Sequence, residues 1–70
     1  MNRANATAAI RDRIENHMHS FKWRHEAAAS LRCLGDERGA RSNLRIAELE
    51  LQKVAELLSI ENHLNGVSPE

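Results

Sequence analysis

Histidine is the residue type in this chain best suited to bind a metal ion. The four histidines are His17, His19, His25 and His63. Two ligands on one face of a helix stand three or four residues apart, and no pair of these histidines has that spacing. We therefore expect solvated or partly buried histidines and no metal site. This spacing does not exclude a metal site that is shared between two copies of the chain.

The acidic residues and the single cysteine do not form a recognisable catalytic set. A nucleophilic cysteine needs a positioned base, and the residue beside Cys33 is Arg32. The glutamates of the second half mostly fall on the flanks of a predicted helix, where solvated carboxylates belong. Neither a concave pocket nor a glycine-rich phosphate loop is indicated. The sequence therefore predicts a protein that is not an enzyme and has no cofactor.

Composition limits where the chain works and what it binds. Ten basic and ten acidic residues give a formal net charge of zero, which argues against a general binder of nucleic acid or membrane surfaces. No apolar run is long enough for a signal peptide or a membrane span. A single cysteine rules out an internal disulfide and suits a reducing compartment. We therefore expect a cytoplasmic protein that does not bind membranes.

Four arginines gather near the middle of the chain. They are Arg32, Arg38, Arg41 and Arg45. Such a cluster can follow a phosphate backbone, although Asp36 and Glu37 lie within it and Trp23 is the one aromatic available for stacking. Binding of nucleic acid through these arginines is therefore an alternative function.

Trp23 is the only tryptophan and lies off the main apolar stripe of the first half. Tryptophan and arginine are frequent anchors of protein interfaces. We therefore predict a partner-binding surface that combines apolar and basic side chains. Its members are Trp23, Ala27, Leu34, Arg32, Arg38, Arg41 and Arg45. The alternative is that Trp23 belongs to the core of a dimer.

A long first helix must position Trp23 and three of the histidines, His17, His19 and His25. Helix-favouring residues without Gly or Pro predict this helix over about 5–34. Its main apolar stripe recurs at spacings of three, four and seven residues, as on one face of a helix. The stripe consists of Ile10, Ile14, Met18, Phe21, Ala28 and Leu31.

A short turn follows the first helix. Gly35 suits the left-handed residue that ends a helix, and Asp36 suits the N-cap of the next helix. Residues 1–70 are therefore expected to form one all-α domain, an antiparallel two-helix hairpin. Its parts are a first helix over about 5–34, a turn at 35–36, a second helix over about 37–64 and a loose tail over 65–70.

Two resemblances concern this hairpin. The turn resembles that of a tetratricopeptide-type helical hairpin in Leu34, Gly35, Asp36, Ala40, Leu44 and Ala47. This similarity indicates local geometry, because stacked repeats need about three units and one hairpin is present here. In size and layout the chain resembles the small helical-hairpin dimers of the Rop type, which bind RNA. That resemblance implies a dimer whose turn-end arginines bind nucleic acid.

The predicted second helix is apolar on two opposite sides. One stripe is Leu44, Ala47, Leu51, Val54 and Leu58, and the other is Ile46, Leu49, Leu57, Ile60 and Leu64. A helix with two stripes needs two neighbours, and the first helix is only one. We expect the first stripe to close the hairpin and the second to be the dimer interface of a four-helix bundle. The alternative is a monomer whose second stripe binds a different protein.

An antiparallel hairpin also sorts the charges. It brings Arg11 and Arg13 near Glu56 and Glu61 at the open end. The turn end, residues 22–45, carries six basic and three acidic side chains, and the remaining residues carry four basic and seven acidic ones. Two hairpins packed head to tail would bring opposite charges together, which can select their orientation.

These expectations combine into a small non-enzymatic homodimer that acts by binding an unidentified protein, as an adaptor, inhibitor or regulator. Chains this short are common among phage and mobile-element products that block one host protein. One alternative is a Rop-like dimer that binds nucleic acid through the turn-end arginines. Another is a structural subunit of a larger helical assembly.

Overall fold

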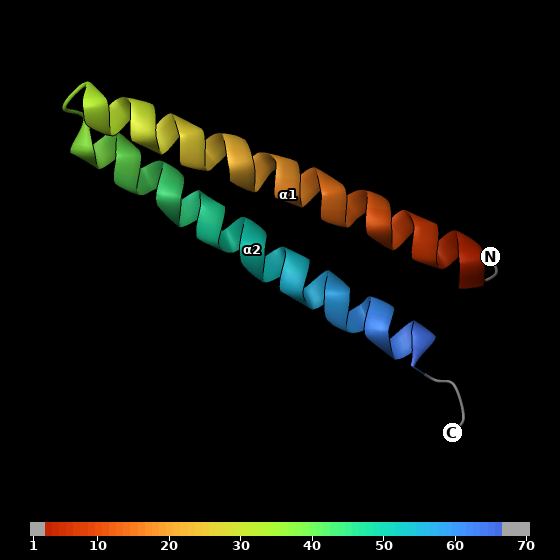
Figure 1. Ribbon diagram of the computed structural model, residues 1–70. Coiled ribbons are helices and arrows are strands. Elements are labelled where there is room, and N and C mark those ends of the chain that lie inside the picture. The colour runs from red at the N-terminus through yellow and green to blue at the C-terminus, as the bar shows by residue number, and fades with distance from the viewer. Residues whose placement is uncertain (1–2, 67–70) are drawn as a thin grey trace.

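Two long antiparallel helices lie side by side in the computed structural model, which describes residues 3–66 (Figure 1). Helix α1 is Arg3–Cys33 and helix α2 is Glu37–Asn65. The expected all-α hairpin is therefore confirmed. Most of the expected loose tail, residues 67–70, lies outside the described residues.

The turn between the helices is short because Asp36 forms hydrogen bonds both with the end of α1 and with the start of α2. Gly35 has a φ of 85°, the left-handed conformation that glycine adopts without steric cost. The backbone N–H of Asp36 donates to the carbonyl of Leu31 at 2.8 Å. The backbone N–H of Gly35 donates to the carbonyl of Arg32 at 3.0 Å, which completes a Schellman motif at the end of α1. The Asp36 carboxylate accepts from the backbone N–H of Gly39 at 2.9 Å and so caps α2.

The helices meet along a seam with a seven-residue repeat. The residues that face the other helix recur every three and four residues, as in a coiled coil, and all are buried or half-buried. From α1 they are Thr7, Ile10, Ile14, His17, Phe21, Arg24, Ala28 and Leu31. From α2 they are Ala40, Asn43, Ala47, Glu50, Val54, Leu57, Glu61 and Leu64. We refer to these residues as the seam.

Small side chains occupy the buried centre of the seam. The buried apolar residues in the described part of the chain are Ala28, Ala40, Ala47 and Val54, and no large side chain there is fully buried. The stripe expected to close the hairpin is therefore divided. Its Ala47 and Val54 face α1, whereas its Leu51 and Leu58 are each 42% exposed. The physical reason is that the seam passes between the two apolar stripes of α2 and does not follow either of them.

A single layer of two helices leaves both broad sides of the molecule uncovered. The molecule measures 54 by 19 by 14 Å. Stable domains usually pack at least two layers against one core. Within residues 3–66, neither helix contains an apolar stretch that is long enough to cross a membrane.

Candidate interaction surfaces

One side of the hairpin carries a row of leucines. Leu58 shares a surface hollow with Arg11 and Ile14. The row of α2 residues that contains Leu58 therefore lies beside the row of α1 residues that contains Arg11. Residues seven positions apart lie in one such row along a helix. Met18, in the same α1 row as Arg11, is 40% exposed, close to the exposure of Leu51 and Leu58. We refer to both rows together as the leucine flank. Its members are Arg11, Met18, His25 and Arg32 of α1 and Glu37, Leu44, Leu51 and Leu58 of α2.

The opposite side carries a second exposed apolar surface. Lys53 and Ile60 share a hollow with Arg13, so their row on α2 lies beside the α1 row of Arg13. Exposure reaches 49% at Ile60, 51% at Leu49, 44% at Trp23 and 81% at Leu34. We refer to this surface as the isoleucine flank. Its members are Arg13, Ser20, Trp23, Ala27 and Leu34 of α1 and Ile46, Leu49, Lys53 and Ile60 of α2.

A polar layer crosses the middle of the seam. Nδ1 of His17 lies 2.5 Å from Oε1 of Glu50, and the Ser20 hydroxyl donates to Oε2 of the same carboxylate at 2.9 Å. These contacts lower the pKa of Glu50 below its ordinary value, and His17 is the larger cause. They also fix the lengthwise position of the helices. Met18 and Leu51 therefore lie at the same height, midway along the hairpin.

A second polar contact in the seam lies nearer the turn. Nη1 of Arg24 donates to the side-chain oxygen of Asn43 at 3.0 Å, and the Asn43 amide donates to the carbonyl of Gly39 at 3.0 Å. The Arg24 guanidinium also lies 4.2 Å from the centre of the Trp23 ring. The position of Trp23 on the isoleucine flank is therefore linked to a seam residue.

An ion pair closes the open end of the hairpin. Nε of Arg11 donates to Oε2 of the buried Glu61 at 2.6 Å. On the isoleucine flank, Arg13 and Glu56 line one hollow. The predicted approach of Arg11 to Glu61 is therefore confirmed, whereas Arg13 and Glu56 only line the same hollow.

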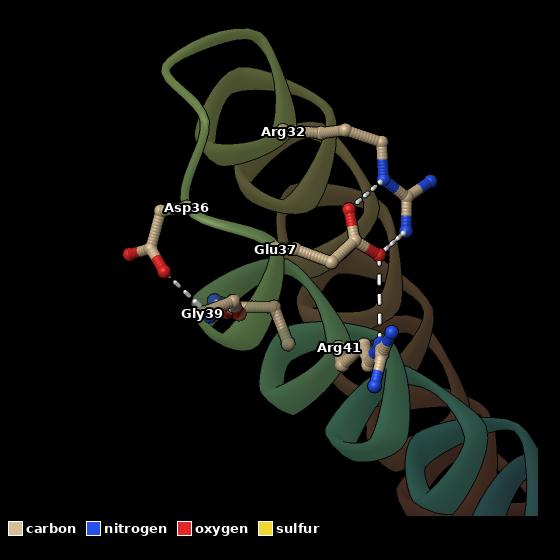
Figure 2. A network of polar contacts seen from close by, with 6 residues as sticks. Arg32, Asp36, Glu37, Gly39 and Arg41 are labelled. Atoms are coloured by element: carbon tan, nitrogen blue, oxygen red, sulfur yellow. Dashed lines mark hydrogen bonds and ion pairs between the residues drawn. The ribbon is translucent and has the colours of Figure 1, made fainter.

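Figure 2 shows that Glu37 binds two of the turn-end arginines. Nε and Nη2 of Arg32 donate to its two carboxylate oxygens at 3.1 Å, and Nε of Arg41 lies 3.5 Å from Oε2. The hydrogen bonds from Arg32 are the main cause that lowers the pKa of Glu37. Arg38 and Arg45 make no ion pair with any described residue, and both line an open hollow with Arg41.

The residues predicted to form the dimer interface lie on more than one surface. Leu57 and Leu64 are half-buried in the seam of their own hairpin. Ile46 is half-buried on the isoleucine flank, and Leu49 and Ile60 are exposed there. The assignment of these residues to a dimer interface stays a prediction.

The predicted partner-binding surface is also divided. Trp23, Ala27 and Leu34 belong to the isoleucine flank. The arginines of that prediction instead bind Glu37 or lie on the outer face of α2. The structure therefore brings the apolar members together and places the basic members elsewhere.

Sequence reasoning did not predict the polar contacts that connect the helices. They join His17 and Ser20 to Glu50 in the polar layer and Arg24 to Asn43 nearer the turn. The signal that could have found them is the seven-residue repeat itself, because it continues through polar as well as apolar positions.

The two exposed flanks and the turn-end arginines are the features of this structure that suggest a function. In the part of the chain that the structure describes, no group of three or more His, Cys, Asp or Glu side chains could hold a metal ion. No family model matches the chain, and comparisons with curated proteins and with solved structures gave no match.

Proposed function

We propose that this chain is a small non-enzymatic protein that forms a homodimer and acts by binding another protein, as an adaptor, inhibitor or regulator. The thin seam is the observation that supports this most. Its buried apolar residues are three alanines and one valine, whereas leucines lie exposed on both flanks and Ile60 is exposed on one of them. Burying one such large side chain contributes about 1.5–3 kcal/mol. Covering the flanks therefore offers stabilisation beyond that which the seam supplies.

Two uncovered flanks favour two different partners. A two-fold dimer uses the same surface of both copies, so it covers one flank of each hairpin. The other flank stays open for a protein with an apolar surface. Trp23 and Leu34 are the kind of large exposed side chains that anchor such contacts. The exposed thiol of Cys33 fits a reducing location such as the cytoplasm.

Affinity capture tests the proposal when the wild-type chain is compared with a Leu49→Asp variant. Leu49 is exposed, so the variant should keep its helical circular dichroism. The expected result is one protein recovered in a fixed ratio with the wild type and lost with the variant. Recovery of several subunits of one assembly would instead support a structural role. Equal recovery with both chains would contradict binding through this surface.

Nucleic acid is a second candidate ligand because of Arg38 and Arg45. These arginines have no ion-pair partner among residues 3–66 and lie on one face of α2, seven residues apart. Titration with generic RNA and DNA at low salt tests this candidate. Replacing both arginines with alanine should reduce the salt dependence of binding by about one unit of slope per arginine. Absence of binding even at low salt would remove this candidate.

A further inference from the structure

We propose that a second copy of this chain binds antiparallel on the leucine flank, with the two-fold axis passing between Met18 and Leu51 of the two copies. This inference rests on the proposed self-association and adds its surface and its orientation. It differs from the prediction that Leu49 and Ile60 form the dimer interface.

The leucine row of α2 is symmetric about its middle residue. Leu51 is the midpoint of Glu37–Asn65, and Leu44 and Leu58 lie seven residues to either side. A two-fold axis at Leu51 therefore sets Leu44 against Leu58 of the partner subunit. Every leucine of the row then contacts another leucine, as a self-complementary interface requires.

The corresponding row of α1 is centred at the same height. Met18 is the midpoint of Arg3–Cys33, and the polar layer holds it level with Leu51. Beside this row, Glu15 lies three residues before Met18 and Lys22 lies four residues after it. The two-fold axis brings Glu15 within one residue, about 1.5 Å, of the height of the partner subunit's Lys22. Both side chains are exposed, so they can form an ion pair at the rim on each side of the axis.

A parallel arrangement would not match these surfaces. It would place α2 over α1 of the partner subunit, so that the leucine row faced the row that contains Arg11 and Arg32. It would also place turn ends together, where residues 22–45 carry six basic and three acidic side chains. The antiparallel arrangement instead places each basic turn end over an acidic open end.

The isoleucine flank is less suited to pairing with itself. The middle of its α2 row is Lys53, between Ile46 and Ile60. An antiparallel dimer centred on the hairpin would bring two Lys53 side chains within about 6 Å of one another along the helix axis. Repulsion between two ammonium groups at the centre opposes this dimer. The isoleucine flank therefore remains open for the other protein.

Cysteine cross-linking tests the surface and the orientation. In a Cys33→Ser background, single cysteines replace Leu44, Leu51 or Leu58, and a short bismaleimide reagent joins thiols that lie close together. We expect Leu51→Cys to cross-link to itself with most of the chain converted. We also expect Leu44→Cys to cross-link mainly with Leu58→Cys when the two variants are mixed. Self-cross-linking of Leu44→Cys at the level of Leu51→Cys would contradict the antiparallel arrangement and overturn the proposal.

The same background carries the control for the other flank. Leu49→Cys and Ile60→Cys place equally exposed thiols on the isoleucine flank. We expect only background cross-linking from both. Efficient cross-linking there, with none at Leu51→Cys, would overturn the leucine-flank dimer and leave the proposed self-association standing. Absence of cross-linking from every variant, together with a monomer in sedimentation, would overturn both.

Charge reversal tests the contact between α1 helices without disturbing the hairpin. Glu15→Lys alone should raise the dimer dissociation constant by roughly tenfold, because symmetry breaks two ion pairs at once. Lys22→Glu alone should have the same effect. The double variant should regain the wild-type dissociation constant. If the double variant instead showed the two increases in dissociation constant multiplied together, the pairing of Glu15 with Lys22 would be contradicted.

Discussion

Polar residues at the interface between the helices set how the hairpin is aligned. Glu50 accepts hydrogen bonds from two α1 side chains, His17 and Ser20, near the middle of the seam. Polar pairs at such positions are a known means of fixing the register of paired helices. Sliding α2 by one turn would leave the half-buried Glu50 carboxylate without these partners, which is costly in a partly desolvated site.

Acid should weaken the hairpin through Glu50. Because its folded-state pKa is lowered, the folded chain keeps this carboxylate ionised at a lower pH than the unfolded chain does. The resulting stabilisation is present above the ordinary glutamate value and is lost as the pH falls through the lower folded value. We expect the free energy of unfolding in urea to fall more steeply between about pH 6 and about pH 3 in the wild type than in Glu50→Gln. The exposed Glu48→Gln variant is the control, and identical slopes in all three chains would contradict the role of Glu50.

Asp36 should be a second residue on which stability depends. Its carboxylate accepts from the backbone N–H of Gly39 and so satisfies an otherwise unpaired donor at the start of α2. Asp36→Ala should reduce the free energy of unfolding by about 1 kcal/mol. Asp36→Asn keeps a capping oxygen and should lose only a fraction of that amount. Equal losses from the two substitutions, measured by urea unfolding, would show that the cap is not the cause.

At the scale of helices, the turn could be predicted from sequence and the contact between helices could not. Gly35 and Asp36 have strong local preferences, so the hairpin followed from them. The seam depends instead on how two helices share space. Alanines such as Ala47 fill the seam, while Leu51 is left on a flank. A prediction from the apolar pattern favours the larger leucine over the alanine as a buried residue. The apolar pattern also could not place Glu50 in the seam, because that position depends on its hydrogen-bond partners in α1.

Overpacking the seam tests where the helices touch. Ala47 is 1% exposed, so Ala47→Leu must force the helices apart and should reduce the free energy of unfolding by about 1–3 kcal/mol. The control Gln52→Leu adds a leucine on the exposed outer face of α2 and should change stability by no more than about 0.5 kcal/mol. Thermal and urea unfolding measure both variants. A stabilising Ala47→Leu would show that the seam does not run through this position.

At the scale of the whole molecule, the shape explains the need for a partner. Two helices in a body only 14 Å thick bury only alanines and one valine among their apolar residues, and several leucines stay exposed on both broad sides. The expectation that this chain has more apolar surface than one hairpin can cover therefore agrees with its exposed residues. The two opposite apolar sides of α2 were predicted, but the exposure of both could not be, because it depends on where α1 lies between the stripes of α2.

Sedimentation equilibrium of the untagged wild-type chain tests most directly whether the hairpin is completed by a second copy. At low micromolar concentration we expect a mass of twice the 7.9 kDa of one chain. The free energy of unfolding should then rise with concentration, by about 1.4 kcal/mol of dimer for each tenfold increase. Leu51→Asp should shift the mass toward that of one chain. A wild-type monomer with full helical content and a concentration-independent unfolding midpoint would contradict self-association.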